Sequence, residues 1–313
     1  MRRDVVRNDV FLEKTIAAVG ERLVIFVVGR SRYEAVNYMS ELYNITWDVA
    51  CLKGKFHLDI RCVFSARSMS SLCGKISFLN DVRIIAGVAD SGVPTYDELL
   101  RLPDLNAVFG DDASVSAEEL NDTSRLGLSA VTYQALGDFV APYFREDLYY
   151  FENEATPLGA HSLVMVGGTF DHLHNGHKKL LSLAVGVSGS RLLVGITSDE
   201  MLVKKKNVQL IESLETREQH VRDYVAFLKP SLQVDFVVLA DAFGPSIVVD
   251  DSDAVLVVST ETVAAVPKIQ EMRACRQLAP LKIFICRRTD ASTLSSSFLR
   301  DQLAVQSGKT QRS

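Results

Sequence analysis

Residues 163 to 305 alternate short apolar runs with longer stretches in which apolar residues recur at helical spacing. The apolar runs have the length of strands and occur at 163–166, 192–196, 234–239, 254–258 and 283–285. Helical spacing occurs at 175–187, 216–228, 262–278 and 295–305. Strands that alternate with helices form βαβ units, whose parallel sheet is buried on both faces and therefore apolar throughout. The sequence predicts an α/β domain built on five parallel strands.

The first half of the chain is also read as α/β. The segment 22–43 reads as strand, turn and helix, and "TYDELL" and "SAEEL", which begin at Thr95 and Ser116, resemble capping boxes that open helices. A further helix is expected at 130–144, and no catalytic motif occurs in this half. Segment 151–161 lacks apolar periodicity and is read as a linker. The expected domains are 1–158, an accessory domain of unknown function, 159–306, and a tail at 307–313.

Charge is distributed unevenly along the chain. Residues 1–158 carry 16 Lys and Arg against 23 Asp and Glu, a net charge of −7, whereas residues 159–306 carry 16 of each. The last seven residues add two positive charges, which gives −5 for the whole chain. This balance provides no basic face for nucleic acid, so a polyanionic substrate would need a local positive site.

Hydropathy and cysteine content restrict the cellular compartment in which the protein is expected. The longest apolar runs, such as 23–28, are far too short to span a bilayer. The five cysteines include no CxxC pair, which favours reduced thiols and argues against a zinc ribbon or a disulfide scaffold. We expect a cytoplasmic protein, with mitochondrial association as a weaker alternative suggested by the arginines near the N-terminus.

The stretch "GGTFDHLHNGHKKLL", residues 167–181, follows the first strand of the predicted sheet. Ligands bind at the carboxyl ends of such strands, and glycines there let the backbone approach a ligand closely. His174 and His177 are three residues apart and share a face in the first turn of a helix, where free N–H groups attract anions. The residues thus favour a phosphate-binding site whose interactions with the phosphate become stronger as negative charge develops on it during the reaction.

Two other interpretations of this stretch remain open from spacing alone. Asp171, His172, His174 and His177 could form a metal cage, although no second cluster of Cys or His follows to complete it. The histidines could also be ordinary surface residues at the start of a helix.

The stretch also matches the signature G-T-F-D-x-x-H-x-G-H at every fixed position, and so resembles the HxGH nucleotidylyltransferases. Residues 163–303 resemble, more closely, the eukaryotic and archaeal type of phosphopantetheine adenylyltransferase, the unit that forms one half of bifunctional coenzyme A synthase. The resemblance covers a little under half of the chain. Further blocks carry it in order: "VGITSDEMLVKKK", "ETREQHVRDYVAFLKPSLQVDFVVLADAFGP", "VVSTET" and "LSSSFLR". It implies a Rossmann-like nucleotidylyltransferase domain.

In that family the phosphate of 4′-phosphopantetheine attacks the α-phosphate of ATP, giving dephospho-coenzyme A and pyrophosphate. The nucleophile is already an anion at neutral pH, so no general base is required and catalysis depends on positioning and charge stabilisation. The resemblance implies that Thr169 orients the attacking phosphate. It also implies that His174 and His177 hold ATP phosphates, with His177 stabilising the transition state.

The resemblance assigns the remaining contacts to three groups of residues. One of Lys204, Lys205 and Lys206 would neutralise the phosphate of the acceptor, and spacing favours Lys205. Three serines open the last helix, where hydroxyls and amides can hold a triphosphate. The residues expected at ATP are Gly168, Thr169, Phe170, His174, His177, Ser259, Glu261, Arg273, Ser295, Ser296 and Ser297. Mg²⁺ would arrive with ATP, and no metal ligands of the protein's own are expected.

The chain departs from the family pattern on the adenine side. Family members commonly have a glycine pair and an asparagine ahead of the arginine, where this chain has Ala264, Ala265, Pro267 and Gln270. His172 and His220 receive no role from the resemblance. Both are expected to be packed or solvated.

Two alternatives to this function are weighed. A cytidylyltransferase acting on a phosphoalcohol shares the HxGH start, but its R-T-x-G-I-S-T-[ST] block is not matched by "RRTDASTLSSSF". A catalytically idle nucleotide-binding scaffold would be expected to lose the threonine, histidines or serines, and all are present. "SGKT" at 307–310 lacks the earlier glycine of a phosphate-binding P-loop, so no kinase half is expected. Expected partners are ATP and 4′-phosphopantetheine, and assembly as a homo-oligomer or with other enzymes of coenzyme A synthesis is left open.

Overall fold

The structure is a computed structural model that describes part of the chain. The described residues are 13–29, 43–55, 58–66, 100–110, 117–123, 125, 127–135, 161–286 and 295–310. The chain divides into two compact units, Met1–Arg145 and Glu146–Ser313. The predicted boundary between residues 158 and 159 lies outside the described residues and stays a prediction.

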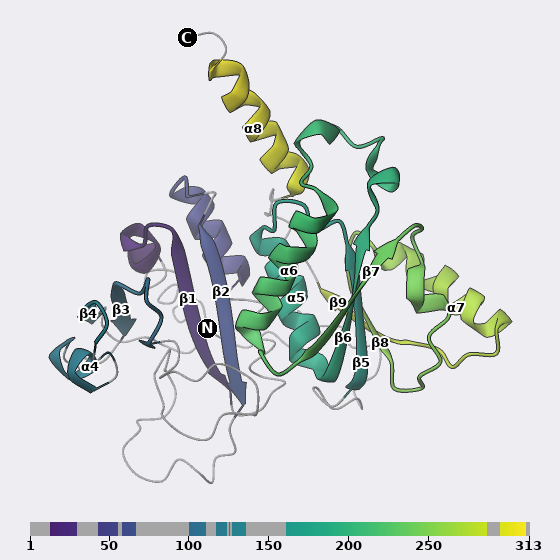
Figure 1. Ribbon diagram of the computed structural model, residues 1–313, viewed down its shortest axis with the longest axis horizontal. Coiled ribbons are helices and arrows are strands. Elements are labelled where there is room, and N and C mark those ends of the chain that lie inside the picture. Colours follow the sequence, from purple (N-terminus) through teal and green to yellow (C-terminus); the bar gives the residue numbers. More distant parts are fainter. Residues whose placement is uncertain are drawn as a thin grey trace, which may run out of the picture. The chain divides into compact units, whose positions relative to one another are not determined.

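The first unit contains two pairs of parallel strands together with short helices (Figure 1). Strand β1 pairs with β2, and β3 pairs with β4. Residues 13–18 and 43–52 are helical. The other bounds are β1 Arg22–Gly29, β2 Asp59–Ala66, β3 Ala107–Gly110, α4 Ala117–Thr123 and β4 Thr132–Ala135. The α/β class of this half and the helix following Ser116 are confirmed, whereas most of "TYDELL" lies outside the described residues.

The helix predicted at 130–144 is wrong over its first residues, because Thr132–Ala135 is strand β4. Val131, Thr132 and Tyr133 are β-branched or aromatic, and such side chains favour strands. Asn121 also bonds both backbone groups of Val131, donating to its oxygen at 3.0 Å and accepting from its nitrogen at 2.8 Å. Tertiary contacts therefore override the helical spacing. Residues 136–144 lie outside the described residues.

The second unit is built on a five-stranded parallel sheet, as predicted. Its strand order is β7-β6-β5-β8-β9, so the first strand of the unit is central and the chain winds outward from it in both directions. This doubly wound order places a ligand site at the carboxyl end of the central strands. The bounds are β5 His161–Gly168, β6 Ser188–Thr197, β7 Gln233–Leu239, β8 Val255–Ser259 and β9 Lys282–Cys286.

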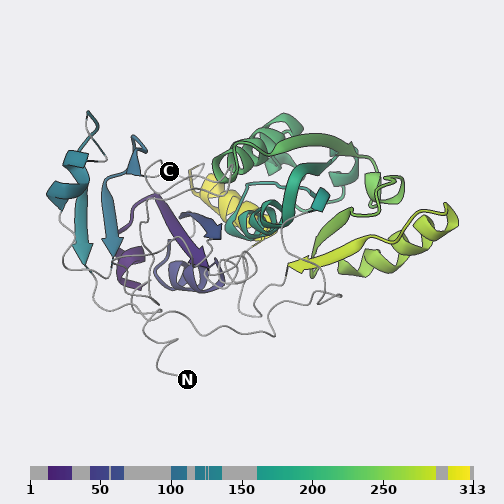
Figure 2. The same cartoon turned by 90° about the horizontal axis from the view of Figure 1, so that it is seen from below.

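Helices cover both faces of this sheet. Helices α5 and α6 pack on one face, and α7 lies on the other (Figures 1 and 2). The bounds are α5 Asn175–Val187, α6 Leu214–Leu228, α7 Val266–Cys275 and α8 Ser296–Thr310, with short 3-10 turns η3 Asp199–Leu202, η4 Val208–Leu210, η5 Gly244–Ile247 and η6 Val263–Ala265. Helix α8 continues through Thr310, so part of the predicted tail is helical. No described helix has the length and apolar character needed to cross a membrane.

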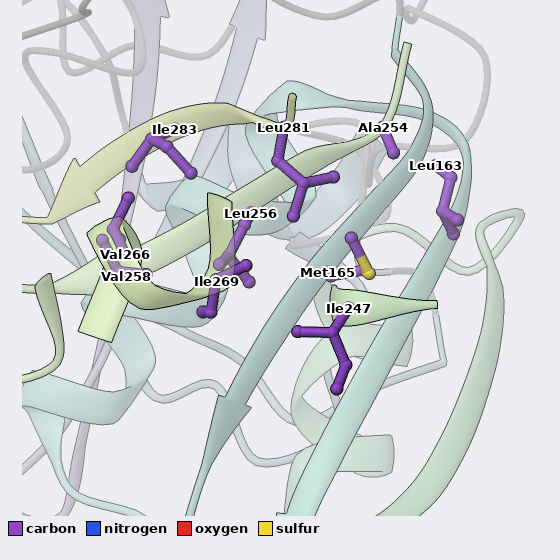
Figure 3. Packing of buried hydrophobic residues seen from close by; sticks show 10 residues of the cluster. All are labelled: Leu163, Met165, Ile247, Ala254, Leu256, Val258, Val266, Ile269, Leu281 and Ile283. Atoms are coloured by element: carbon purple, nitrogen blue, oxygen red, sulfur yellow. The ribbon is translucent and has the colours of Figure 1, made fainter. Parts of the chain in front are cut away.

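Alternation along the strands divides the core between the two faces. Leu163 and Met165 of β5 point to the face covered by α7, where they pack with residues of β8, β9, η5 and α7 (Figure 3). Their neighbours Val164 and Val166 are fully buried and point to the opposite face, because successive side chains of a strand alternate. The cluster drawn in Figure 3 is Leu163, Met165, Ile247, Ala254, Leu256, Val258, Val266, Ile269, Leu281 and Ile283.

The amino end of the sheet is closed by a charged network. Strand β5 begins at His161, so the predicted linker extends one residue too far. His161 Nδ1 lies 3.0 Å from Asp253 Oδ1, and the same carboxylate accepts from Lys282 Nζ at 2.6 Å and from the Ser162 amide at 3.0 Å. These bonds tie β5, β9 and the turn before β8 together. They fix the strands whose opposite ends form the candidate site.

Candidate active site

The candidate site begins in the loop after β5, at the carboxyl end of the sheet. Phe170 and His172 have φ angles of 52° and 47°, a left-handed conformation that is uncommon for residues other than glycine. Phe170 is fully buried, and a Cβ atom at Gly168 would lie 3.3 Å from its ring. Gly168 therefore makes room for the Phe170 ring. The shape of the loop is fixed by packing.

His174 caps helix α5 with its side chain. Its Nδ1 atom accepts from the Gly176 amide at 3.1 Å and from the His177 amide at 3.4 Å. A Cβ atom at residue 176 would come within 3.0 Å of His174 Cε1, which explains why a glycine stands inside the motif. Because Nδ1 accepts, a neutral His174 carries its proton on Nε2. Nε2 is therefore the ring nitrogen through which a neutral His174 donates.

His174 and His177 are brought together, as the motif predicts. Their rings stack with centroids 3.8 Å apart and planes 18° from parallel, and the Phe170 ring lies 5.4 Å from that of His177. The pair stands at the first turn of a thirteen-residue helix, whose amides and dipole favour an anion. The arrangement suits phosphate oxygens.

The three lysines have different partners. Lys205 Nζ donates to Thr169 Oγ1 at 2.9 Å, whereas Lys206 Nζ donates to Asp301 Oδ2 at 2.9 Å and is thereby bound to α8. Lys204 is exposed. The pKa of Lys205 lies below the ordinary value for lysine, first because of partial desolvation and next because of the Arg300 guanidinium. Among the three, Lys205 is the one that meets the threonine expected at the acceptor phosphate.

A buried ion pair holds the loop that carries Thr169. Asp171 and Arg300 are 0% and 1% exposed, and Arg300 Nη1 donates to Asp171 Oδ2. The other carboxylate oxygen accepts from the Glu212 amide at 2.9 Å, and Arg300 Nε donates to the Lys206 carbonyl at 3.2 Å. The Arg300 guanidinium thus joins the loop after β5, the segment that contains Lys204, Lys205 and Lys206, and helix α8. Removing one partner of such a pair typically costs about 3–5 kcal/mol.

The three serines at the start of α8 are not equivalent. Ser295 Oγ caps the helix by accepting from the Phe298 amide at 3.2 Å. Ser296 Oγ donates its proton to the Asp171 carbonyl at 3.0 Å, so that proton is already used. Ser297 Oγ accepts from Arg300 Nη2 at 3.1 Å, which leaves its own proton available to a ligand. Ser295 and Ser297 can donate to an anion without losing these bonds.

Ser259 and Glu261 lie at the carboxyl end of β8. The Ser259 amide donates to Thr262 Oγ1 at 3.0 Å, and the two hydroxyl oxygens lie 3.2 Å apart. Glu261 is exposed and contributes to the potential at Lys205, where it raises the pKa of the amine. Both residues are therefore at the same end of the sheet as the histidines, and their nucleotide contacts stay predictions.

Arg273 has a structural environment instead of an open one. It is 0% exposed and donates to the carbonyls of Ala279 at 2.8 Å, Ser246 at 2.8 Å and Val249 at 2.9 Å. The guanidinium thereby satisfies the backbone at the carboxyl end of α7 and after η5. Its Nη2 atom is buried without a hydrogen-bond partner among the described residues, and its role at ATP stays a prediction.

His172 and His220, which received no role, both lie beside Glu212. His172 donates its backbone amide to Glu212 Oε2 at 2.8 Å, and its Nε2 lies 2.8 Å from the Leu210 carbonyl. His220 Nδ1 lies 3.5 Å from Glu212 Oε2. Among the described residues, Asp171, His172 and Glu212 are the one group close enough to share a metal ion. Asp171 is paired with Arg300, and His172 Nε2 lies beside the Leu210 carbonyl, whereas His172 Nδ1 lies 3.7 Å from Glu212 Oε1.

Sequence reasoning missed Arg217 and Arg300, which organise the loops around Thr169. Both arginines lie within blocks that carry the family resemblance, "ETREQH" and "LSSSFLR". Their acceptors are mostly backbone carbonyls and a carboxylate far away in sequence, and neither spacing nor periodicity reports such partners. Only the position of each arginine inside an apolar helix face hints at burial.

Comparisons with known proteins agree with this geometry. A family model described as cytidylyltransferase-like matches residues 165–302. A Saccharomyces cerevisiae protein named phosphopantetheine adenylyltransferase is 42% identical over 120 residues, 38% of this chain and 39% of the yeast chain. Proteins of the same name are 38% identical in Methanopyrus kandleri, covering 47% of this chain and 94% of that one, and 36% identical in Pyrobaculum aerophilum, covering 44% and 88%. The matched region thus spans about two fifths of the yeast relative and nearly all of the Methanopyrus protein.

Proposed function

The chain belongs, through its second unit, to the phosphopantetheine adenylyltransferase family, and on this premise we propose that it transfers AMP from ATP to 4′-phosphopantetheine. The products would be dephospho-coenzyme A and pyrophosphate. The observation that carries the proposal is the contact between Lys205 Nζ and Thr169 Oγ1 at 2.9 Å. Lys205 and Thr169 together form what we call the acceptor corner, which presents an amine and a hydroxyl at the carboxyl end of β5. Thr169 belongs to the loop that leads to the stacked histidines.

The acceptor phosphate binds in this corner. Lys205 neutralises part of its charge, and the Thr169 hydroxyl orients the attacking oxygen. Partial desolvation and then the Arg300 guanidinium lower the pKa of the Lys205 amine, and a bound phosphate dianion would stabilise its charged form. The attacking oxygen needs no deprotonation, so the chain supplies position and charge instead of a general base.

The nucleotide phosphates bind at the first turns of α5 and α8. His174 donates through Nε2, and His177 contacts the phosphoryl group on which negative charge develops. Ser295 and Ser297 donate their remaining protons to the leaving phosphates, and the amides of α8 add to them. Two helix starts and two imidazoles then surround one triphosphate. Bond formation at the α-phosphate proceeds as the bond to pyrophosphate breaks.

We propose that Mg²⁺ enters with ATP and is held by phosphate oxygens and water. Its chemistry there is to neutralise charge on the phosphates. The described residues fit this arrangement because their donors are cations, amides and hydroxyls, which bind oxygen anions, whereas the carboxylate of Asp171 is committed to Arg300.

The proposal also covers the cellular compartment of the protein, the role of its first unit and its partners. Cys51, Cys62, Cys275 and Cys286 are free thiols in the described parts of the chain, which supports a reducing compartment such as the cytoplasm. The first unit is proposed to be an accessory domain that affects stability, assembly or choice of partner. Association with a second copy or with other enzymes of the pathway is proposed on the family relation alone.

The deciding experiment supplies purified protein with ATP, Mg²⁺ and 4′-phosphopantetheine and measures dephospho-coenzyme A and pyrophosphate in equal amounts. A parallel reaction contains CTP and phosphoethanolamine. Product only in the second reaction would replace the proposal with a cytidylyltransferase. Nucleotide binding without product in either reaction would favour the idle scaffold.

A further inference from the structure

Arg217 is a buried residue whose side chain joins separate loops at the carboxyl end of the sheet. It is 0% exposed although it lies in the first turn of α6. Its Nη1 donates to the carbonyls of Thr169 and Thr197 at 2.9 Å each, and its Nε donates to the carbonyl of Glu212 at 3.0 Å. Its Nη2 donates to Asp199 Oδ1 at 2.6 Å. All three nitrogens of the guanidinium are therefore used.

Three of these four acceptors, Thr169, Thr197 and Asp199, lie on the two segments whose side chains form the acceptor corner. The Thr169 carbonyl belongs to the peptide that precedes Phe170, where the backbone turns into its left-handed conformation. Thr197 ends β6, and Asp199 begins the turn that leads to Lys205. One planar group with fixed donor directions thus sets the spacing between the segment that carries Thr169 and the segment that carries Lys205.

We propose that Arg217 is a positioning residue for the acceptor phosphate: it holds the Thr169 backbone against the end of β6, so that the Thr169 hydroxyl and the Lys205 amine meet at the distance that a phosphate requires. This inference rests on the proposed function and adds a residue that contacts neither substrate. Four of the five N–H donors of the guanidinium are used by backbone carbonyls and by Asp199, so its described contacts are with the loops that carry the site.

A buried arginine can also be purely structural, and the first unit contains one. Arg125 is 2% exposed and donates to backbone carbonyls that include Leu102 at 3.1 Å and Ser129 at 2.8 Å. Arg125→Lys is therefore a matched control for Arg217→Lys. Each change keeps the charge and replaces a planar fork by a single amine that cannot reach all acceptors.

The test is steady-state kinetics of the full chain with each substrate varied in turn. For Arg217→Lys we expect the KM for 4′-phosphopantetheine to rise by about tenfold or more and kcat to fall, because a shift of about 1 Å in a positioning group can cost 10²-fold. The KM for ATP should rise clearly less than the KM for the acceptor, since most of the residues expected at ATP, the histidines and serines among them, are not held by Arg217. Arg125→Lys should lower the melting temperature while leaving both KM values unchanged.

A milder variant keeps the proposal testable if Arg217→Lys does not fold. The Asp199 side chain is 67% exposed, so Asp199→Asn should fold, and it weakens the bond to Arg217 Nη2. A selective rise of about twofold to fivefold in the KM for the acceptor supports the proposal. Equal changes in the two KM values, or a lower melting temperature with no change in either, would overturn it.

The activity of the wild-type protein distinguishes a failure of the proposed function from a failure of the inference about Arg217. If it uses a different phosphorylated acceptor, the same comparison of KM values is made with that acceptor, because Arg217 holds Thr169 whichever acceptor binds. A readout without turnover is the binding of inorganic phosphate, followed by ³¹P NMR. Weaker phosphate binding in Asp199→Asn or Arg217→Lys than in Arg125→Lys supports the inference, and equal binding in all variants contradicts it.

Discussion

The two ends of the five-stranded sheet each hold a carboxylate between positive groups, but they differ in how their charges are balanced. At the amino end, Asp253 accepts from Lys282, His161 and the Ser162 amide. Burial alone would raise the pKa of Asp253, and these donors outweigh it and lower that pKa to about 2. The ionised carboxylate is therefore the form that this end of the sheet favours.

At the carboxyl end, the described hydrogen bonds join Lys205 to a hydroxyl and not to a carboxylate. Asp171 is taken by Arg300, and the Lys205 amine has a neutral hydroxyl as its hydrogen-bond partner. Its pKa is lowered by desolvation and by Arg300, so the charged form is disfavoured where it stands. Perturbed groups of this kind cluster at functional sites. One end of the sheet is thus tied together by a carboxylate and its donors, whereas the other presents an amine whose described hydrogen-bond partner is a hydroxyl.

The largest expected effect comes from removing a donor at the carboxyl end. His177→Ala should lower kcat by roughly two to three orders of magnitude, which is typical for a group that stabilises charge in the transition state. ATP affinity should change much less. Single-turnover kinetics, with nucleotide binding measured separately, check both expectations.

His220→Ala is the matched control for this variant. His220 lies on α6 beside Glu212, without a contact to His174 or His177 among the described interactions, and its replacement should leave kcat near the wild-type value. If His177→Ala turned over at a rate close to that of His220→Ala, the role of His177 would be refuted.

A smaller effect on activity should distinguish Ser297 from its neighbour Ser296. Ser297 can donate its proton to the triphosphate, whereas the proton of Ser296 is bound to the Asp171 carbonyl. Ser297→Ala should lower kcat/KM for ATP by about tenfold, the loss of one hydrogen bond to a charged group. Ser296→Ala should instead lower the free energy of unfolding by about 1 kcal/mol. Kinetics and thermal melting of both variants give the comparison, and the opposite order of effects would contradict it.

The fold of the second unit could be predicted because its signals are local. Apolar runs give the five strands, and the bounds of α5 match the prediction because the helical spacing begins directly after a capping residue, His174. In the first unit, β4 was mistaken for a helix because its identity depends on pairing with β3 and on Asn121, which no periodicity reveals.

The candidate site could be predicted only in part for the same reason. Short motifs place Thr169, His174 and His177 together, and spacing selects Lys205, the lysine that contacts Thr169. The hydrogen bonds of Arg217 reach carbonyls that are far apart in sequence, and Arg273 turned out to bond backbone on the α7 side of the sheet. The direction of a buried guanidinium depends on tertiary packing, and a family position alone does not report it.

The stability that the amino end of the sheet contributes should depend on pH and not on substrate. Because the folded-state pKa of Asp253 is depressed to about 2 from 3.8, its contribution is fully present above pH 3.8 and is lost as the pH falls toward 2. Allowing for solvent screening of a side chain that is 39% exposed, Asp253→Asn should cost about 1 kcal/mol at neutral pH. Denaturation curves of wild type and variant should converge as the pH is lowered toward 2. A difference that stays constant with pH would mean that the ionised network does not stabilise this end.

The smallest expected effect follows removal of the first unit. If the amino end of the sheet is held by its own charges, a chain shortened to begin at Glu154 retains His161, Asp253 and Lys282 and should keep its strand order. The residues proposed for both substrates also lie beyond that point, and the −7 charge of residues 1–158 offers nothing that would attract an anionic substrate. We therefore expect kcat to fall by no more than about threefold. Cooperative melting of the shortened chain checks its folding, and steady-state kinetics with both substrates check its site. A shortened chain that melts cooperatively but binds neither ATP nor 4′-phosphopantetheine would show that the first unit contributes to the site, and the carboxyl end of the sheet would then not suffice for function.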